Sequence, residues 1–370
     1  MQETSSNEHT VPLSHIFLVF LKIGTFAFGG VYSMLAFVRR EVVEKRRWIT
    51  EEEYAEAVVI GQMAPGPPII NTAIYIGTHL RGTAGAVAAT LGQIVTGLLL
   101  AVVLAQAYLA HKDLALVQSV LKGIGAAVVG LLASVVVGLG RKFAVSWEGA
   151  GIATASLLGV SLLGANPIGV LLAAGLGGWL VFSGKNGAPP SPPNGSAGSA
   201  DIWVLFATLF VINAFTIGGG YVMLPLIESE LVDRRGWLTH AEFLDAIAVG
   251  QITPGPLTVM NAFIGQKLFG GWGAFAATLG SYLPPLIIAT LAARHHIRYK
   301  TSPHVIAVFR AVRPAVVGLL ASVLLTLAWR GIGSPAAALT ALAAFSAIHF
   351  TRIDPTFVIL AAGLLGFLFL

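Results

Sequence analysis

The chain alternates between long apolar stretches and short polar segments. The longer stretches run for about 17 to 25 residues with hardly a charge, which is the length a helix needs to cross the hydrocarbon core of a bilayer. They are rich in Ala, Leu, Val and Gly and lack the alternation of apolar and polar positions that marks barrel strands. Only helices and closed barrels satisfy their backbone groups in lipid, so the pattern predicts an all-α integral membrane protein.

The pattern occurs twice. The segment FAFGGVYSM at residues 26–34 returns as FTIGGGYVM at 215–223, and KRRWITEEEYAEAVVIGQMAPGP at 45–67 returns as RRGWLTHAEFLDAIAVGQITPGP at 234–256. Both pairs are 189 residues apart, and later matches such as AATLG and AVVGLLASV are 188 residues apart. A constant separation over so many matches indicates an internal duplication.

A Pro-, Gly- and Ser-rich segment separates the two copies and is typical of a flexible linker. The predicted organisation is therefore a polar tail, a first repeat, a linker and a second repeat, at residues 1–13, 14–182, 183–201 and 202–370. The tail lacks the positive charge that opens a signal peptide, so we expect the first apolar stretch to remain as a span.

Each repeat begins with an expected span, at residues 14–38 and 203–227. A charged loop, a broken apolar segment, two long spans and a shorter hairpin follow. In the charged loop, Thr50 with Glu53 and Thr239 with Glu242 have the spacing of a capping box, which predicts a helix start. This gives about five spans per repeat plus the broken or re-entrant segment.

The loop charges bear on orientation. The loop after the first span is more basic in the first repeat, whereas the loop after the third apolar segment is more basic in the second. Basic residues mark the cytoplasmic side, so the opposite biases favour repeats inserted in opposite senses, which requires a re-entrant broken segment. If that segment crosses fully, each repeat has six spans and the repeats are parallel.

A Pro-Gly-Pro element interrupts an apolar segment in both repeats, and a Gln precedes it. Proline removes a backbone donor and clashes with the preceding turn, so the helix must break there. Breaks at matching positions of two repeats point to a transporter binding site, and the helix that starts after each break directs its positive end at an anion. A structural kink is the alternative. The candidate residues are Gln62, Pro65, Gly66, Pro67, Gln251, Pro254, Gly255 and Pro256.

Glycine clusters lie within the first expected span of each repeat, at Gly29 and Gly30 and at Gly218 and Gly219. Small residues let membrane helices pack closely without any ligand. The alternative is that these glycines open the helix beside the break, so that backbone amides contact the substrate.

Three cationic side chains are further candidates, because an ionisable group inside a span is costly. Lys22 has no charged partner nearby in the sequence. Arg310 and Arg313 are three residues apart and leave one helix face, and two guanidinium groups suit a tetrahedral dianion. Extension of these side chains to the membrane interface is the alternative.

The composition excludes several classes of protein. Hydrophobic residues make up 56% of the chain and charged residues 11%, and there is no cysteine. Disulfides, thiolate metal sites and thiol redox chemistry are therefore excluded. The net charge of +5 is scattered between the spans, so no nucleic-acid partner is expected. No phosphate loop, zinc motif or nucleophile elbow occurs, so we expect no enzyme, no cofactor and no metal.

The motifs GG-x-x-x-M, W-[IL]-T and GQ-x-x-PGP, repeated in this layout, make the chain similar to the chromate ion transporter family in its two-domain, long-chain form. The resemblance covers essentially the whole chain apart from the tail and the linker. It implies a carrier in the bacterial inner (plasma) membrane that exports chromate and confers chromate resistance. An ion gradient or the membrane potential would supply the energy.

Our hypothesis from the sequence is a secondary active oxyanion exporter in which the two breaks face each other near the bilayer midplane. Lys22, Arg310 and Arg313 would supply charge, with Gln62 and Gln251 at the oxygens. Uptake of sulfate or another oxyanion, coupled to protons, is the first alternative, although the acidic residues fall mainly in loops. A passive anion channel and a membrane redox enzyme are the others. The oligomeric state stays open, with a homodimer as one candidate.

Overall fold

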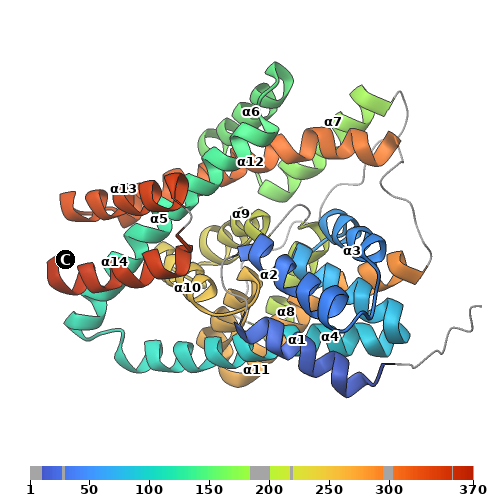
Figure 1. Ribbon diagram of the computed structural model, residues 1–370. Coiled ribbons are helices and arrows are strands. Elements are labelled where there is room, and N and C mark those ends of the chain that lie inside the picture. Colours follow the sequence, from blue (N-terminus) through green and yellow to red (C-terminus); the bar gives the residue numbers. More distant parts are fainter. Residues whose placement is uncertain are drawn as a thin grey trace, which may run out of the picture.

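The computed structural model describes residues 11–26, 30–183, 201–216, 220–294, 303–351 and 353–369. All regular structure in these ranges is helical (Figure 1). The helices of the first repeat are α1 Leu13–Phe26, α2 Gly30–Arg39, the π-helical turn η1 Arg40–Lys45, α3 Glu51–Met63, α4 Pro68–His111, α5 Ala115–Phe143, α6 Trp147–Leu163 and α7 Pro167–Ser183. Those of the second repeat are α8 Ile202–Phe215, η2 Gly220–Val222, α9 Met223–Ile227, η3 Glu228–Arg234, α10 His240–Ile252, η4 Leu257–Val259, α11 Met260–Arg294, α12 Pro303–Gly331, α13 Pro335–Phe350 and α14 Pro355–Phe369.

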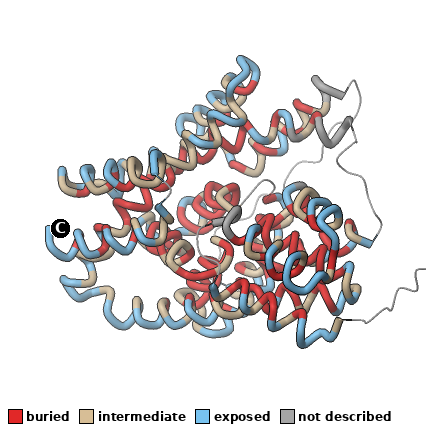
Figure 2. The backbone as a smooth tube through the Cα atoms, in the orientation of Figure 1, coloured by how far each residue is buried: buried red, intermediate tan, exposed pale blue. Residues whose placement is uncertain are grey.

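Four of the described helical segments are long and apolar enough to cross a membrane: Pro68–His111, Ala115–Phe143, Leu257–Arg294 and Arg310–Gly331. Shorter apolar helices of 10–17 residues accompany them. Large apolar side chains are exposed, including Trp147 at 95% and Trp329 at 89%. Figure 2 shows exposed residues in pale blue along the outer helices. Such a surface fits contact with lipid. The prediction of a helical chain with several apolar helices is confirmed within the described residues.

Helices α4 and α11 each fold back on themselves. The backbone leaves the helical conformation at Arg81 and Gly82 in α4, and at the matching positions of α11. A Cβ atom added to Gly77 would overlap the carbonyl of Gly85, although residues eight apart in a straight helix lie about 12 Å apart. Each of these helices is therefore a short leg followed by a long, antiparallel leg.

The prediction of one continuous span at residues 14–38 and again at 203–227 is wrong. Helix α1 ends at Phe26 and α2 begins at Gly30, while α8 ends at Phe215 and the 3-10 turn η2 begins at Gly220. Thr216, which follows α8, has an extended backbone, so that helix ends there. Residues 27–29 and 217–219 lie outside the described residues.

The predicted helix starts after the charged loops are confirmed. Thr50 caps α3 and Thr239 caps α10, and in each case the Glu side chain three residues later bonds back to the threonine backbone amide. The preceding turns, η1 and η3, are both π-helical. The same local signals therefore produce the same structure in both repeats.

The repeats exchange their C-terminal hairpins. Helices α13 and α14 of the second repeat pack against α5 of the first, and α6 and α7 of the first pack against α12 of the second (Figure 1). Small residues allow the close approach: a Cβ atom on Gly130 would overlap the carbonyl of Ala341, and one on Gly318 would overlap that of Ala153. These two contacts are equivalent positions of the two repeats.

Hydrogen bonds repeat this reciprocity. Ser134 of α5 lies 3.2 Å from Nδ1 of His349 in α13, and Ser161 of α6 donates to Ser322 of α12 over 3.0 Å. Ser134 and Ser322 are equivalent positions, as are Ser161 and His349. Each terminal hairpin is therefore held by the long helix of the other repeat.

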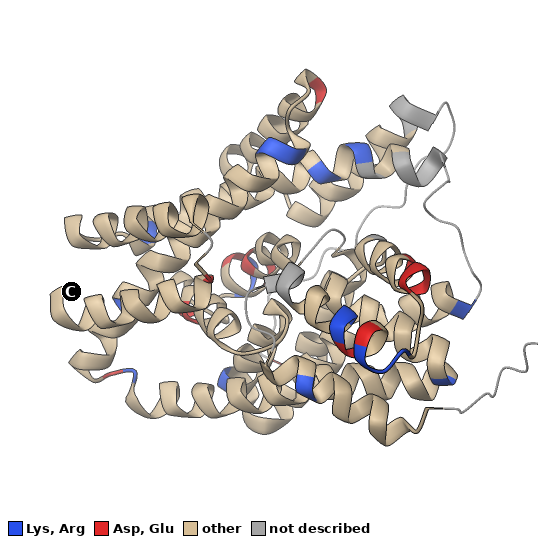
Figure 3. Ribbon diagram, in the orientation of Figure 1, with Lys and Arg blue, Asp and Glu red and all other residues tan. Residues whose placement is uncertain are grey.

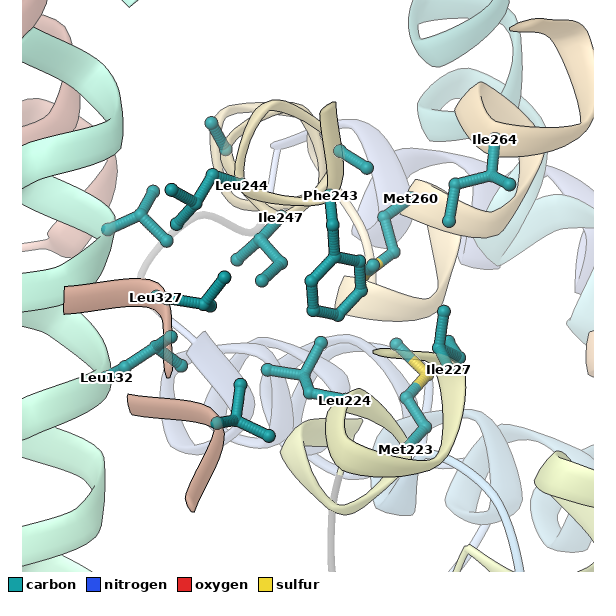
Figure 4. Close-up of a cluster of buried hydrophobic side chains, with 14 of the residues drawn as sticks. Leu132, Met223, Leu224, Ile227, Phe243, Leu244, Ile247, Met260, Ile264 and Leu327 are labelled. Atoms are coloured by element: carbon teal, nitrogen blue, oxygen red, sulfur yellow. The ribbon is translucent and has the colours of Figure 1, made fainter. Parts of the chain in front are cut away.

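Two large buried apolar clusters hold the helices together: one is built mainly on α1–α4, and the other joins α8–α11 to α5, α12 and the hairpin helices. In the second repeat, Phe243 of α10, Met260 of α11 and Leu224 of α9 point toward one another (Figure 4). All three are fully buried. This packing fixes α10, which leads into the Pro-Gly-Pro break, against its neighbours.

The exchange predicts a position-dependent effect of leucine in α5. Gly130→Leu should lower the melting temperature of the purified protein by several degrees, because overpacking of this kind costs about 1–3 kcal/mol. Gly138→Leu on the same helix is the control, since its Cβ atom meets nothing within 4 Å. Thermal unfolding in detergent measures both, and equal melting temperatures would contradict the hairpin exchange.

Candidate functional site

The Pro-Gly-Pro element of the first repeat forms the tip of a helical hairpin. Helix α3 has 13 residues and runs into the break, and the first leg of α4 leaves it in the opposite direction, so that Gly61 lies against Thr72. Gly66 at the tip has φ +96° and its counterpart Gly255 has φ +112°. Residues other than glycine rarely adopt these backbone φ angles, so both turns depend on glycine.

Asn71 completes the first break. Its side-chain Nδ2 donates to the carbonyl oxygens of Gly61, Ala64 and Pro65 at 3.1, 3.0 and 3.0 Å. These carbonyls lie where proline interrupts the helix, and the fully buried amide satisfies them. Sequence reasoning did not assign Asn71, although a lone amide four residues after the prolines in an apolar run was an available signal.

Each break contacts the other repeat. The amide of Gly66 donates to the carbonyl of Thr216 at the end of α8 over 2.6 Å, and Gly66 lies against Pro285 of α11. In the matching contact, the carbonyl of Pro254 lies against Gly97 of α4. Gly97 and Pro285 are equivalent positions. Both breaks therefore lie along the interface of α4 with α11, where the repeats meet.

Buried amide side chains accompany the breaks. Gln93 of α4 is fully buried, and neither side-chain amide atom has a hydrogen-bond partner among the described residues. Its backbone carbonyl oxygen lies about 4.0 Å from the position that a Cβ atom on Gly255 would take. The side-chain oxygens of Asn71, Asn213 and Asn261 are also buried without a partner in that part of the chain. Unpaired buried polar atoms cost about 1–3 kcal/mol each, so these amides are candidate contacts for a polar ligand.

The two glutamines predicted from the sequence lie at the ends of α3 and α10. Gln62 is exposed. Gln251 donates from Nε2 to the hydroxyl of Tyr221 over 2.9 Å, and its carbonyl accepts from Thr356 of α14 over 3.1 Å. Gln93 is more buried than either of these glutamines.

Lys22 has a partner that sequence reasoning missed. Its Nζ lies 3.1 Å from Oε1 of Glu41, a fully buried carboxylate that also binds Lys45 at 2.9 Å and Arg46. Nineteen residues separate Lys22 from Glu41, too far to be seen as a pair in the sequence. The fold brings them together, so Lys22 is one of three cations that surround a single buried carboxylate.

Arg310 and Arg313 lie apart from the breaks. Arg310 pairs with Glu148 of α6 at 2.8 Å, and the Arg313 guanidinium lies over the ring of Phe143 of α5, 5.5 Å from its centroid. With Lys142 they line a small pocket between α5, α6 and α12. Figure 3 marks Lys and Arg positions along α12 in blue. The structure thus divides the predicted residues into a group at the breaks, Lys22 beside Glu41, and the arginine pair on α12.

Of the glycine candidates, Gly30 begins α2. Gly29, Gly218 and Gly219 lie outside the described residues. In the part of the chain that the structure describes, no group of three His, Cys, Asp or Glu residues could hold a metal ion.

The expectation that acidic residues fall mainly in loops needs correction. Four carboxylates in the described ranges are buried: Glu41 at 0%, Glu228 at 5%, Glu230 at 7% and Asp245 at 8% exposure. They belong to η1, η3 and α10. Buried acidic groups therefore lie on the segments that precede each break.

Comparison with known proteins gives consistent matches. The model of the family described as "Chromate transporter" matches residues 14–179 and 203–367. The chain is 30% identical to the "Chromate transport protein" of Cupriavidus metallidurans, over 97% of this chain and 94% of that protein. It is 29% identical to the "Probable chromate transport protein" of Synechococcus elongatus, over 88% of each.

A shorter relative matches a single repeat. The "Uncharacterized transporter YwrA" of Bacillus subtilis is 29% identical over 44% of this chain and 93% of its own length. No solved structure matches the chain.

The geometry of the first break predicts the effect of removing Asn71. Asn71→Leu leaves three carbonyls without their donor, at a cost of about 1 kcal/mol for each hydrogen bond. The melting temperature in detergent should fall by several degrees. Gln118→Leu, at an exposed amide on α5, is the control and should leave it unchanged. An equal response of the two variants would contradict the role of Asn71 in the break.

Proposed function

The chain belongs to the chromate transporter family, and from this premise we propose that it is a secondary active transporter exporting chromate, a sulfate-like oxyanion, from the bacterial cytoplasm. Membership of a transporter family argues against an enzyme. The observation that supports the proposal most directly is the pair of helix breaks at the repeat interface, with buried amide side chains beside them. Broken helices at matching positions of two repeats are typical of transporter binding sites.

Gln93 is the main protein ligand in this proposal. Its buried Nε2 is a neutral donor suited to an oxyanion oxygen, and its backbone carbonyl lies close to the second break. The helices that begin after Pro67 and Pro256 add the positive ends of their dipoles. Neutral donors hold an anion without pairing it to a fixed charge, and so allow it to leave again.

The remaining candidate residues have supporting roles outside the proposed binding site. Arg310 and Arg313 line a pocket that could attract an anion toward the protein, while Gln62 and Gln251 lie at the ends of the helices that reach the breaks. Lys22 is paired with Glu41 and acts in positioning η1. Gly29, Gly218 and Gly219, the other residues predicted from the sequence, lie outside the described residues.

The membrane arrangement is also part of the proposal. A 13-residue helix is about 20 Å long, which is too short to cross a core of about 30 Å. A hairpin of α3 with the first leg of α4 that enters and leaves on one side fits this length. The proposal keeps about five spans per repeat, counting the interrupted segments 14–38 and 203–227 as one each, with inverted repeats and the division at residues 14–182, 183–201 and 202–370. The alternative, with six spans per repeat and parallel repeats, requires the broken segment to cross the membrane fully.

The membrane potential favours export. Each elementary charge gains about 2.3 kcal/mol per 100 mV, so a dianion leaving a negative interior gains about 4.6 kcal/mol. Uptake of sulfate or a related oxyanion is the second candidate. Because uptake of a dianion runs against this potential, it needs a coupling proton. The buried carboxylate of Asp245, which has no ion-pair partner within the described residues, is an observation that favours it.

The test is chromate accumulation in intact cells that lack other chromate exporters. The chain should lower accumulation, and Gln93→Ala should abolish most of this effect, because the proposed ligand is lost. Pro65→Ala and Pro254→Ala should also reduce it, by allowing helix to run through the breaks. Gln106→Ala is the control, since Gln106 is an exposed amide on the same helix as Gln93.

Equal membrane expression of all variants is required for the comparison. Unchanged accumulation with the parent chain would remove chromate as the substrate. Higher accumulation, suppressed by excess sulfate, would establish uptake in place of export. Wild-type behaviour of Gln93→Ala would move the binding site away from α4.

A further inference from the structure

A basic pocket lies at the corner where α6 follows α5 and packs on α12, apart from the two breaks. Lys142 of α5 and Arg310 and Arg313 of α12 line it, together with one carboxylate, that of Glu148 in α6. Its volume is about 180 Å³. Three cations and one carboxylate leave an excess of positive charge, so the pocket is suited to an anion.

Two of the cations converge on one aromatic ring. Nζ of Lys142 lies 5.4 Å from the ring centroid of Phe143, and the guanidinium carbon of Arg313 lies 5.5 Å from the same centroid. Like charges held beside one ring repel each other, and an anion that contacts both offsets this repulsion. Arg310 contributes less positive charge to the pocket, because it pairs with Glu148 at 2.8 Å.

The pocket lies at the ends of two helical segments that are long enough to cross a membrane. Lys142 is the last residue but one of Ala115–Phe143, and Arg310 is the first residue of Arg310–Gly331. Trp147, which begins α6 beside the pocket, is 95% exposed. Tryptophan is enriched where a bilayer meets water, so these features together indicate that the cations lie at the level of the lipid headgroups.

The pocket has apolar walls as well as charges. Phe143, Ile152 and Pro314 line it beside the cations. Farther along α6, Leu162 and Leu163 are exposed at 75% and 82%. A hydrated oxyanion gains nothing from apolar walls. A phospholipid can place its phosphate at the cations and its acyl chains against the apolar surface, so the combination favours a lipid.

We propose that this pocket binds the phosphate group of an anionic phospholipid from the surrounding bilayer, with Lys142 and Arg313 as its main ligands. The start of α6, a helix of 17 residues, adds the positive end of its dipole. A lipid phosphate, rather than the transported oxyanion, is then the occupant of this corner. The pocket is separate from the two breaks, so the proposal does not depend on which anion the chain carries.

Binding of radiolabelled phosphatidylglycerol to the immobilised full-length protein in detergent tests this. Phosphatidylcholine, whose headgroup has no net charge, should compete poorly. Lys142→Gln and Arg313→Gln should each weaken the binding of phosphatidylglycerol about fivefold, the factor expected for one basic residue at a membrane surface. Lys122→Gln is the matched control and should bind like the parent chain. It removes an exposed cation from α5 at the position equivalent to Arg310.

Glu148→Gln provides a gain of binding that a damaged fold cannot imitate. Loss of this carboxylate should strengthen the binding of phosphatidylglycerol about fivefold. Sodium sulfate, added at constant ionic strength, should not displace the lipid, and displacement would show that the pocket takes a free oxyanion instead. Unchanged binding in Lys142→Gln and Arg313→Gln, or an equal loss in Lys122→Gln, would also overturn the proposal. None of these measurements uses transport, so failure of chromate export would leave them unaffected.

Discussion

Wherever a helix is interrupted in apolar surroundings, its backbone carbonyl and amide groups need partners that water cannot supply. The Pro-Gly-Pro elements create this requirement twice. At the first break, Asn71 satisfies three carbonyls and the Thr216 carbonyl of the other repeat accepts from Gly66. A break of this kind is stable only where other protein segments surround it. The breaks therefore lie at the interface between the repeats, and the buried amides lie beside them.

The exchanged hairpins form a second level of connection. Gly130 with Ala341 and Gly318 with Ala153 use the same small-residue contact in both directions. As a result, α6 and α7 pack with the second repeat and α13 and α14 with the first. A movement that alternates access cannot be a displacement of one sequence repeat against the other without separating these contacts.

The repeats share their architecture and differ in their charges. Lys22 pairs with Glu41 in the first repeat, whereas Val211 takes its place in the second. Arg39 and Glu228 occupy equivalent positions with opposite charge. Duplication preserves the positions at which a helix must start, break or pack, because backbone geometry fixes them. Polar side chains at the same positions diverge as long as each finds a new partner, as Glu228 does in His240.

Local chemistry determined much of this structure from the sequence alone. Apolar length predicted membrane helices, the threonine and glutamate spacing predicted both capping boxes, and proline predicted both breaks, because each of these effects acts within a few residues of the chain. Partners distant in the sequence were decided only by the tertiary structure. Lys22 reaches Glu41 only through the fold of the chain. Arg310 and Arg313 contact Glu148 of α6 and Phe143 of α5. No short sequence feature predicts the exchange of hairpins. Gln93 reads in the sequence as one amide in an apolar helix, and only the packing of α4 beside the second break buries it without a partner. Such choices depend on which surfaces meet in three dimensions, and pairing of that kind is not encoded in any short segment.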